Sequence, residues 1–148
     1  MKNIKYIILS ASFVFLFLSG MGQTYLMDNT PVTTCSGNFY DSGNTGGDYS
    51  SSESFTKTFS PSVPGNMLQI AFTYWDCESI TYDNLTIYDG PNTGSPVIGT
   101  YGGSTGPGIV LATNTGDLTF VWSSDASVTY PGWEATISCI SPSPMTYV

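Results

Sequence analysis

The sequence predicts an all-β fold, an antiparallel sandwich of two sheets, and three observations support this class. No stretch has apolar residues at the i, i+3, i+4 and i+7 spacing of an amphipathic helix. Apolar and polar residues instead alternate in several short segments, as they do in a strand with one buried face. Segments rich in Gly, Pro, Asn and Asp separate these strands and supply the backbone conformations of turns.

Residues 1–22 have the features of a secretory signal peptide. Lys2 and Lys5 precede an apolar run over residues 6–18, and small residues follow at the spacing that signal peptidase prefers. The run has about thirteen residues, fewer than the roughly twenty that are needed to span a bilayer. We therefore expect cleavage before Gln23, a secreted or cell-surface protein, and no membrane span.

The remaining chain divides into a lead-in over residues 23–34, one domain over residues 35–139, and a short tail over residues 140–148. Two prolines and the loss of alternation in the tail indicate a linker or the start of a following domain. Without the signal peptide, Lys57 is the only basic side chain against eleven acidic residues. This charge excludes the basic surface that binds nucleic acid and favours contact with cations or basic partners.

The strands of the domain are expected where alternation is clearest, at residues 68–72, 85–87, 118–122 and 133–137, with turns at residues 61–66, 89–96, 102–108 and 114–117. Trp122 and Trp133 fall on the apolar phase of their strands, so we expect both in the core, together with Trp75. The segment 36–54 is rich in Gly and Ser, as linkers are. Its aromatic residues give it something to pack, so we expect an ordered, irregular edge of the domain.

The complete chain contains neither histidine nor arginine. This composition excludes a Ser-His-Asp triad, a Cys-His pair, a histidine-ligated zinc site and an arginine clamp. A pair of carboxylates can still hydrolyse glycosides, and Glu78 with Asp83 or Asp125 is the candidate pair. Nothing in the sequence places a substrate between these residues, so we expect no enzymatic activity.

Three cysteines enter an oxidising export route, in which disulfides persist. Three cannot all pair within the chain. Cys35 and Cys139 lie near the two ends of the domain, so a bond between them would close a loop of about a hundred residues and stabilise the fold by about 4 kcal/mol. Cys77 would then remain as a small side chain that behaves as a hydrophobe.

Four of the eleven acidic residues fall in the stretch FTYWDCESITYDNLTIYDG at residues 72–90, which otherwise has the pattern of two strands. Like charges this close repel one another unless a positive group lies among them, so these carboxylates either point into water or hold a cation. We interpret Asp76 as a solvated or turn residue and Asp89 as a turn residue that bonds nearby backbone amides. Glu78 and Asp83 are the ligand candidates.

Four patterns, in this order and spacing, resemble a CUB domain of the cysteine-poor type found in secreted bacterial proteins: F-x-x-W-D-C-E at 72–78, YDNLTIYDG at 82–90, WSSDASV at 122–128 and GWEATISC at 132–139. The resemblance implies a jelly-roll-like, antiparallel β-sandwich of two sheets. Cys77 takes the place of an inward leucine of the family. We therefore predict a Cys35–Cys139 disulfide and a buried free thiol at Cys77.

The resemblance also implies a calcium site at one end of the sandwich. The acids of the family's site correspond to Glu78, Asp83 and Asp125, with the backbone carbonyl of Ser127 as a further ligand and Tyr49 bonded to one carboxylate. Ca²⁺ takes roughly six to eight oxygen ligands, which these groups and water could supply. Mg²⁺ is less suited, because it demands a tighter octahedron.

Two features depart from the vertebrate form of the family. The second disulfide is absent, with Thr81 and Gly102 near the places of its cysteines, and the loop from Glu78 to Asp83 is shorter, which affects the expected affinity for calcium more than the existence of the site. We expect a non-catalytic, calcium-binding interaction module that binds a basic protein partner at the calcium end. The alternative is a carbohydrate-binding or adhesion accessory module of a secreted hydrolase, because exposed aromatic faces stack on sugars.

Overall fold

The computed structural model describes residues 22–142. Most of the expected signal peptide and most of the expected linker lie outside the described residues. Within them the chain forms ten strands and no helix, so nothing in this part has the form of a membrane-crossing helix. The strands are β1 (Thr24–Leu26), β2 (Val32–Thr33), β3 (Ser36–Tyr40), β4 (Ser54–Ser60), β5 (Met67–Asp76), β6 (Asn84–Tyr88), β7 (Val97–Tyr101), β8 (Ile109–Leu111), β9 (Leu118–Ser123) and β10 (Gly132–Ile140).

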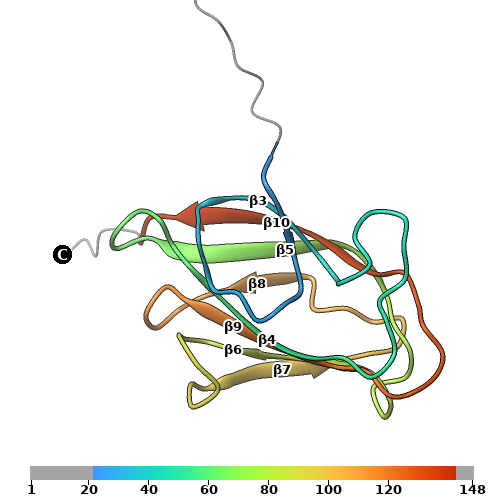
Figure 1. The fold of residues 1–148 in the computed structure, drawn as a ribbon. Coiled ribbons are helices and arrows are strands. Elements are labelled where there is room, and N and C mark those ends of the chain that lie inside the picture. Colours follow the sequence, from blue (N-terminus) through green and yellow to red (C-terminus); the bar gives the residue numbers. More distant parts are fainter. Residues whose placement is uncertain (1–21, 143–148) are drawn as a thin grey trace, which may run out of the picture.

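The strands form two five-stranded sheets that pack face to face (Figure 1). One sheet has the order β1-β3-β10-β5-β8, and the other has the order β2-β4-β9-β6-β7. The expected all-β sandwich is confirmed. The expected lead-in contributes an edge strand to each sheet, through β1 and β2.

Two strand pairs differ from the antiparallel prediction, because β1–β3 and β2–β4 are parallel. The first five strands of the chain alternate between the two sheets, so each strand runs opposite to the one before it. Strands two apart in the sequence therefore run in the same direction, and they become parallel when they are neighbours in one sheet. The alternation of apolar and polar side chains predicts where the strands are. It does not predict that consecutive strands lie in different sheets.

The core lies between the sheets and follows the predicted alternation. Trp122 and Trp133 are fully buried, as expected, and their rings meet edge to face with centroids 5.1 Å apart. Trp75 is half-buried and stacks on Trp133 at 5.7 Å. In segment 36–54, Phe39 and Tyr49 are buried, so this segment is ordered as expected. The other large apolar side chains of the core include Phe59, Leu68, Ile70, Leu85, Ile87, Leu118 and Phe120.

A disulfide joins Cys35 to Cys139 across 104 residues of sequence, with the two Cα atoms 4.9 Å apart. Cys35 directly precedes β3, and Cys139 lies near the end of the neighbouring strand β10. Cys77 is a buried free thiol, as predicted. The bond therefore ties the beginning of the folded domain to its end.

Three loops meet at one end of the sandwich (Figure 1). They connect β3 to β4 (residues 41–53, teal), β5 to β6 (residues 77–83) and β9 to β10 (residues 124–131). Backbone hydrogen bonds join the first loop to the third, from the N–H of Ser52 to the carbonyl of Asp125 at 2.6 Å and from the N–H of Tyr49 to the carbonyl of Tyr130 at 3.1 Å. This end carries the acidic cluster.

Candidate metal centre

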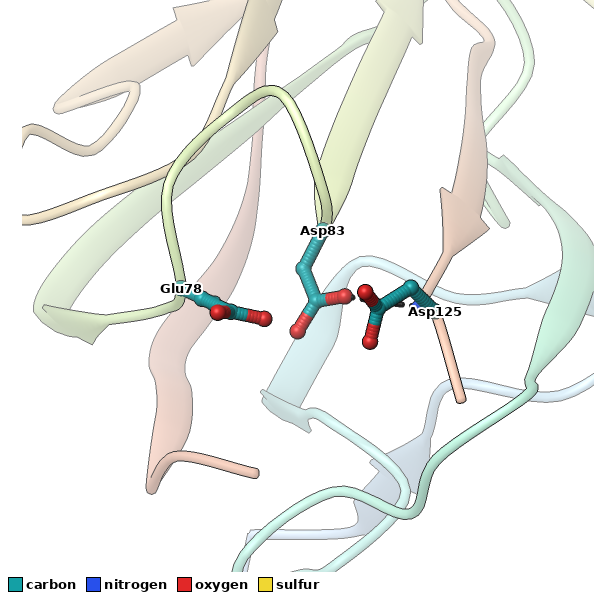
Figure 2. Close-up of side chains that lie close together, drawn as sticks. All are labelled: Glu78, Asp83 and Asp125. Carbon is teal, nitrogen blue, oxygen red and sulfur yellow. Dashed lines mark hydrogen bonds between the residues drawn. The ribbon is translucent and has the colours of Figure 1, made fainter. Parts of the chain in front are cut away.

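Three carboxylates converge at this end of the sandwich. Glu78 follows β5, Asp83 directly precedes β6, and Asp125 follows β9. One oxygen from each lies within 4.8 Å of the other two. Figure 2 shows the three side chains pointing toward one another, with Asp83 between the other two. The register of the second sheet explains the meeting of the aspartates, because β6 and β9 pair at Asn84 and Ser123.

Asp83 is the most constrained of the three. Its side chain is fully buried; Oδ1 accepts a hydrogen bond from the backbone N–H of Asp125 at 2.8 Å, and Oδ2 accepts one from the hydroxyl of Tyr49 at 2.5 Å. The Tyr49 hydroxyl accepts in turn from the backbone N–H of Glu78 at 3.0 Å. Tyr49 thus connects the backbone at one candidate ligand to the carboxylate of another.

The environment of Tyr49 keeps its phenol protonated. Burial raises its pKa far above the usual value, and the neighbouring carboxylate of Asp83 raises it further. The ring is fully buried and packs edge to face on Trp122, with centroids 4.8 Å apart. A phenol held in this way remains a hydrogen-bond donor to the carboxylate.

Asp125, in the loop after β9, is held by hydrogen bonds from the backbone N–H groups of two loops. The N–H of Ser127 donates to Oδ1 of Asp125 at 2.8 Å, and the carbonyl of Asp125 accepts from Ser52 across the loops. Val128 follows with a φ of +60°, a conformation that β-branched residues rarely adopt. A ligand role for the Ser127 carbonyl stays a prediction.

Glu78 has a buried carboxylate oxygen, Oε2, without a hydrogen-bond partner among residues 22–142. Loss of hydration raises the pKa of Glu78, and the charges of Asp125 and Asp83 raise it further. Lys57 is the only basic side chain in the described part of the chain, and it is paired with Asp28 at 2.6 Å. No described side chain therefore neutralises the three acids, and a cation among them would remove both the repulsion and the missing contact.

The chemistry of these donors fits calcium. Ca²⁺ binds carboxylate and carbonyl oxygens in flexible geometries, and a cluster of three acids on loops provides such ligands. The structure supplies no sulfur or imidazole donor to the cluster, which consists of carboxylates alone. The residues that are present could thus hold Ca²⁺.

The other two acids of the stretch 72–90 lie outside the cluster. Asp76 is half-buried at the end of β5. Asp89 is buried at the opposite end of β6, where its carboxylate accepts hydrogen bonds from Thr113 and from the side chain of Asn114. Burial acts to raise the pKa of Asp89, but these bonds outweigh it and hold the pKa below the usual value. Its partners are in the loop after β8 rather than in its own turn, which corrects the expectation.

Glu53 is a residue of this end that sequence reasoning missed. Its Oε2 accepts from the indole N–H of Trp122 at 3.0 Å, and its Oε1 accepts from the hydroxyl of Ser42 at 2.5 Å. Its backbone also exchanges hydrogen bonds with Ser124, which precedes Asp125. Glu53 therefore holds the first loop against the third. No sequence signal distinguishes it, because Trp122 and Ser124 are about 70 residues away.

Comparison with protein families gives one matching model, described as the CUB domain, over residues 30–137. Among curated proteins the chain is similar to Tolloid-like protein 1 of Mus musculus, with 38% identity over 80 residues, and of Homo sapiens, with 36% identity. Each match covers 51% of this chain and 8% of the relative. The chain therefore spans less than a tenth of the length of these relatives.

Solved structures share the fold. The CUB2 domain of MASP-1 bound to Ca²⁺ matches with a TM-score of 0.63 and 21% identity, over 75% of this chain and 98% of that one. The CUB1-EGF-CUB2 domain of human MASP-1/3 matches with a TM-score of 0.65 and 20% identity, over 80% of this chain and 44% of that one. The extracellular region of zebrafish Gpr126/Adgrg6 matches with a TM-score of 0.66 and 22% identity, over 78% of this chain and 15% of that one.

Proposed function

The chain belongs to the CUB domain family, and on this premise we propose that it is a non-catalytic, calcium-stabilised interaction module of a secreted or cell-surface protein. The observation that carries the proposal is the convergence of Glu78, Asp83 and Asp125 within 4.8 Å, with no described basic side chain among them. CUB domains mediate protein interactions, and a CUB domain of the same fold binds Ca²⁺.

In this proposal Glu78, Asp83 and Asp125 hold the ion, the carbonyl of Ser127 adds a ligand, and water completes the shell. The bound ion supplies positive charge that offsets the three carboxylates. Since the ligands come from the loops after β5 and β9, calcium joins these two loops. Its removal loosens this end of the sandwich and leaves the core between the sheets intact.

The expected partner is a protein that presents a basic group at the calcium end. Loops at the ends of strands are where a sandwich offers its contacts. The described residues carry eleven acidic side chains against Lys57, so a lysine or arginine of a partner meets a complementary field. Two half-exposed side chains, Ile80 and Tyr82, flank the carboxylates in the loop between Glu78 and Asp83.

The geometry argues against one of the two candidate glycosidase pairs, Glu78 with Asp83. A glycosidase needs two accessible carboxyl groups with a sugar between them. Asp83 is fully buried and both of its oxygens accept hydrogen bonds, so it is not free to act as a nucleophile or an acid.

Thermal unfolding of residues 23–148 with calcium, with magnesium and with chelator tests the metal site. A ligand at about a hundred times its Kd stabilises a protein by about 2.7 kcal/mol, so calcium should raise the melting temperature by several degrees. The variant Asp125→Asn should lose this response. Asp117→Asn, in the turn at the opposite end, is the matched control and should keep it. An equal effect of magnesium, or a full response of Asp125→Asn, would show that the site is absent.

A short peptide with one lysine, acetyl-Ala-Lys-Ala-amide, probes the partner side of the proposal. It should bind the calcium-loaded domain, and binding should weaken as ionic strength rises, because exposed charge pairs are screened within about 8 Å at physiological salt. Binding that survives chelation unchanged would place the basic group elsewhere.

A further inference from the structure

β8 is an edge strand with an apolar outer face. It is the last strand of its sheet, and among the ten described strands it pairs with β5 alone (Figure 1). Val110 is buried in the core, whereas Ile109 is 71% exposed and Leu111 is 39% exposed. Ile109 is the most exposed large apolar side chain among residues 22–142. An uncovered edge with apolar side chains is a place where another strand can add to the sheet.

The backbone of β8 leaves the N–H and carbonyl groups of Ile109 and Leu111 at this edge. On the β5 side, the carbonyl of Gly108 accepts a hydrogen bond from the N–H of Phe72 at 2.9 Å. Successive residues of a strand direct their N–H and carbonyl groups to opposite sides. Ile109 and Leu111 are one and three positions after Gly108, so their backbone groups point away from β5.

The neighbouring edge of the other sheet is protected, and the edge at β8 is not. β7 is the last strand of the second sheet and is joined to β8 by residues 102–108. It carries an extra residue, Ile98, between the partners of Ile87 and Tyr88, and such a bulge twists an edge away from incoming strands. β8 has no bulge, no proline and no charged side chain, which are the usual devices against edge pairing.

Charge indicates which chain can approach this edge. No charged side chain occurs from Gly90 to Gly116, a segment that contains both β7 and β8. Gln69 and Ala71, the outer-face residues of β5 beside β8, are neutral as well. Elsewhere in the described chain, eleven acidic residues against Lys57 repel a second copy of the same acidic chain. A basic partner gains nothing from a neutral edge, whereas two copies can meet here without bringing carboxylates together.

The sequence of β8 is self-complementary in an antiparallel pair with a two-fold axis at Val110. Ile109 of one copy then lies opposite Leu111 of the other, so apolar side chains meet on the outer face of the sheet. The same register places the free N–H and carbonyl groups of Ile109 opposite those of Leu111, where they can form hydrogen bonds. A two-fold contact of this kind is closed, so it does not extend into a fibre.

We propose that this chain forms a two-fold dimer in which β8 pairs with β8 of a second copy. The pairing joins the two five-stranded sheets into one continuous sheet. The contact is small, because β8 has three residues, so the dimer is weak, with a dissociation constant on the order of 100 μM. The dimer does not use the carboxylates of the candidate metal centre, so it stands or falls independently of the proposed function.

Sedimentation equilibrium of residues 23–148, at chain concentrations from about 10 μM to about 1 mM, tests this proposal. The mass should rise from that of a monomer toward that of a dimer and no further. The dimer should strengthen from about 0.1 M to about 1 M NaCl, because the screening length falls from about 10 Å to about 3 Å and the acidic copies repel one another less. The proposed contact with a basic partner has the opposite dependence on salt. The variant Asp125→Asn should dimerise like the unaltered protein.

Ile109→Glu should weaken the dimer by more than about tenfold, because the new carboxylate lies in an apolar contact opposite Leu111. Val63→Glu is the matched control. It adds the same charge at a position that is 48% exposed, in the turn between β4 and β5, and should dimerise like the unaltered protein. Both substituted side chains are exposed in a single copy, so thermal unfolding of the monomers should be nearly unchanged.

A pair of opposite charges tests the register. Leu111→Lys alone should weaken the dimer, as Ile109→Glu does. A mixture of the two variants should dimerise again, since the new carboxylate of one copy then faces the new ammonium group of the other. A mixture of Val63→Glu with Leu111→Lys should not.

The proposal is overturned if the unaltered chain stays monomeric over this range of concentration and salt. It is also overturned if Ile109→Glu dimerises normally, or if its mixture with Leu111→Lys stays monomeric. A chain that dimerises only after residues 143–148 are removed would show that its own tail occupies the edge, and that outcome contradicts the proposal as well.

Discussion

The hydroxyl of Tyr49 shows how one buried polar group can organise a candidate metal centre. It donates to Asp83 and accepts from the backbone N–H of Glu78, so it bridges two candidate ligands. Because Tyr49 is fully buried, water cannot replace the hydroxyl without rearrangement of the core. The distance between the Glu78 backbone and the Asp83 carboxylate is therefore set by a single oxygen atom.

Tyr49→Phe should destabilise the domain by about 1–3 kcal/mol, since it leaves two buried polar groups unpaired while the ring packing stays. It should also weaken calcium binding, because the Asp83 carboxylate loses its orienting donor. Urea unfolding with and without calcium measures both effects. Tyr82→Phe removes an exposed hydroxyl and should change neither. Equal stability of Tyr49→Phe and the unaltered protein would mean that the hydroxyl contributes nothing.

The strands β3 and β10 are joined at the loop end by a buried carboxylate. Asp41 directly follows β3; its Oδ1 accepts from the N–H of Gly43 at 2.7 Å, and its Oδ2 accepts from the N–H of Trp133 at 3.0 Å. Gly132 has a φ of +70°, and a Cβ there would collide with the Asp41 carboxylate. Only glycine therefore allows β10 to begin this close to the end of β3.

Burial raises the pKa of Asp41 from 3.8 to about 6, against the opposing effect of its hydrogen bonds. The folded state thus holds this proton more tightly than the unfolded chain does. Its stabilising effect is complete below about pH 4 and is lost as the pH rises through about 6. The total loss is on the order of 3 kcal/mol, at about 1.4 kcal/mol for each pKa unit.

Urea unfolding between pH 4 and pH 7 should therefore show a steeper fall of stability in the unaltered protein than in Asp41→Asn. Both proteins share the carboxylates of the candidate metal centre, so comparing the two slopes removes the contribution of those carboxylates. Asp117→Asn should keep the steep slope. Parallel curves for the unaltered protein and Asp41→Asn would contradict a raised pKa at this position.

At the scale of the whole molecule, the disulfide closes the domain. Cys35 and Cys139 are 104 positions apart in the sequence, and the segment that they enclose contains nearly all of the core, so the bond restricts most of the unfolded domain. Cys77 takes no part, because it is buried and burial raises its pKa well above the usual value. A buried, protonated thiol is a poor nucleophile for exchange with the bond.

Replacement of both bonded cysteines, in the variant Cys35→Ser/Cys139→Ser, should lower the free energy of unfolding by about 2–5 kcal/mol. Urea unfolding under non-reducing conditions measures the loss. Reductant should destabilise the unaltered protein by a similar amount and leave the double variant unchanged. Rapid alkylation of Cys77 in the folded, oxidised protein would contradict its enclosure.

The sequence by itself determined the strands and the kind of core. The alternation of Leu68 and Ile70, of Leu85 and Ile87, and of Phe120 and Trp122 is a local property with a period of two residues, and each of these side chains is buried. The motifs around Glu78, Asp83 and Asp125 also predicted which acidic residues would lie together, and the structure brings these three together. The binding of calcium by this cluster stays a prediction. In both cases the information lies in short stretches of sequence.

Only the tertiary structure decided which loops meet and what they enclose. Glu53 bonds to Trp122, Asp89 to Thr113, and Asp41 to Trp133, at separations of 69, 24 and 92 residues. The parallel pairing of the edge strands β1 and β2 has the same origin. The local alternation predicts which face of a strand a side chain lies on. The hydrogen-bond partner of that side chain depends on how the chain connects the strands of the two sheets. That path is chosen by the packing of the whole core, to which all ten strands contribute.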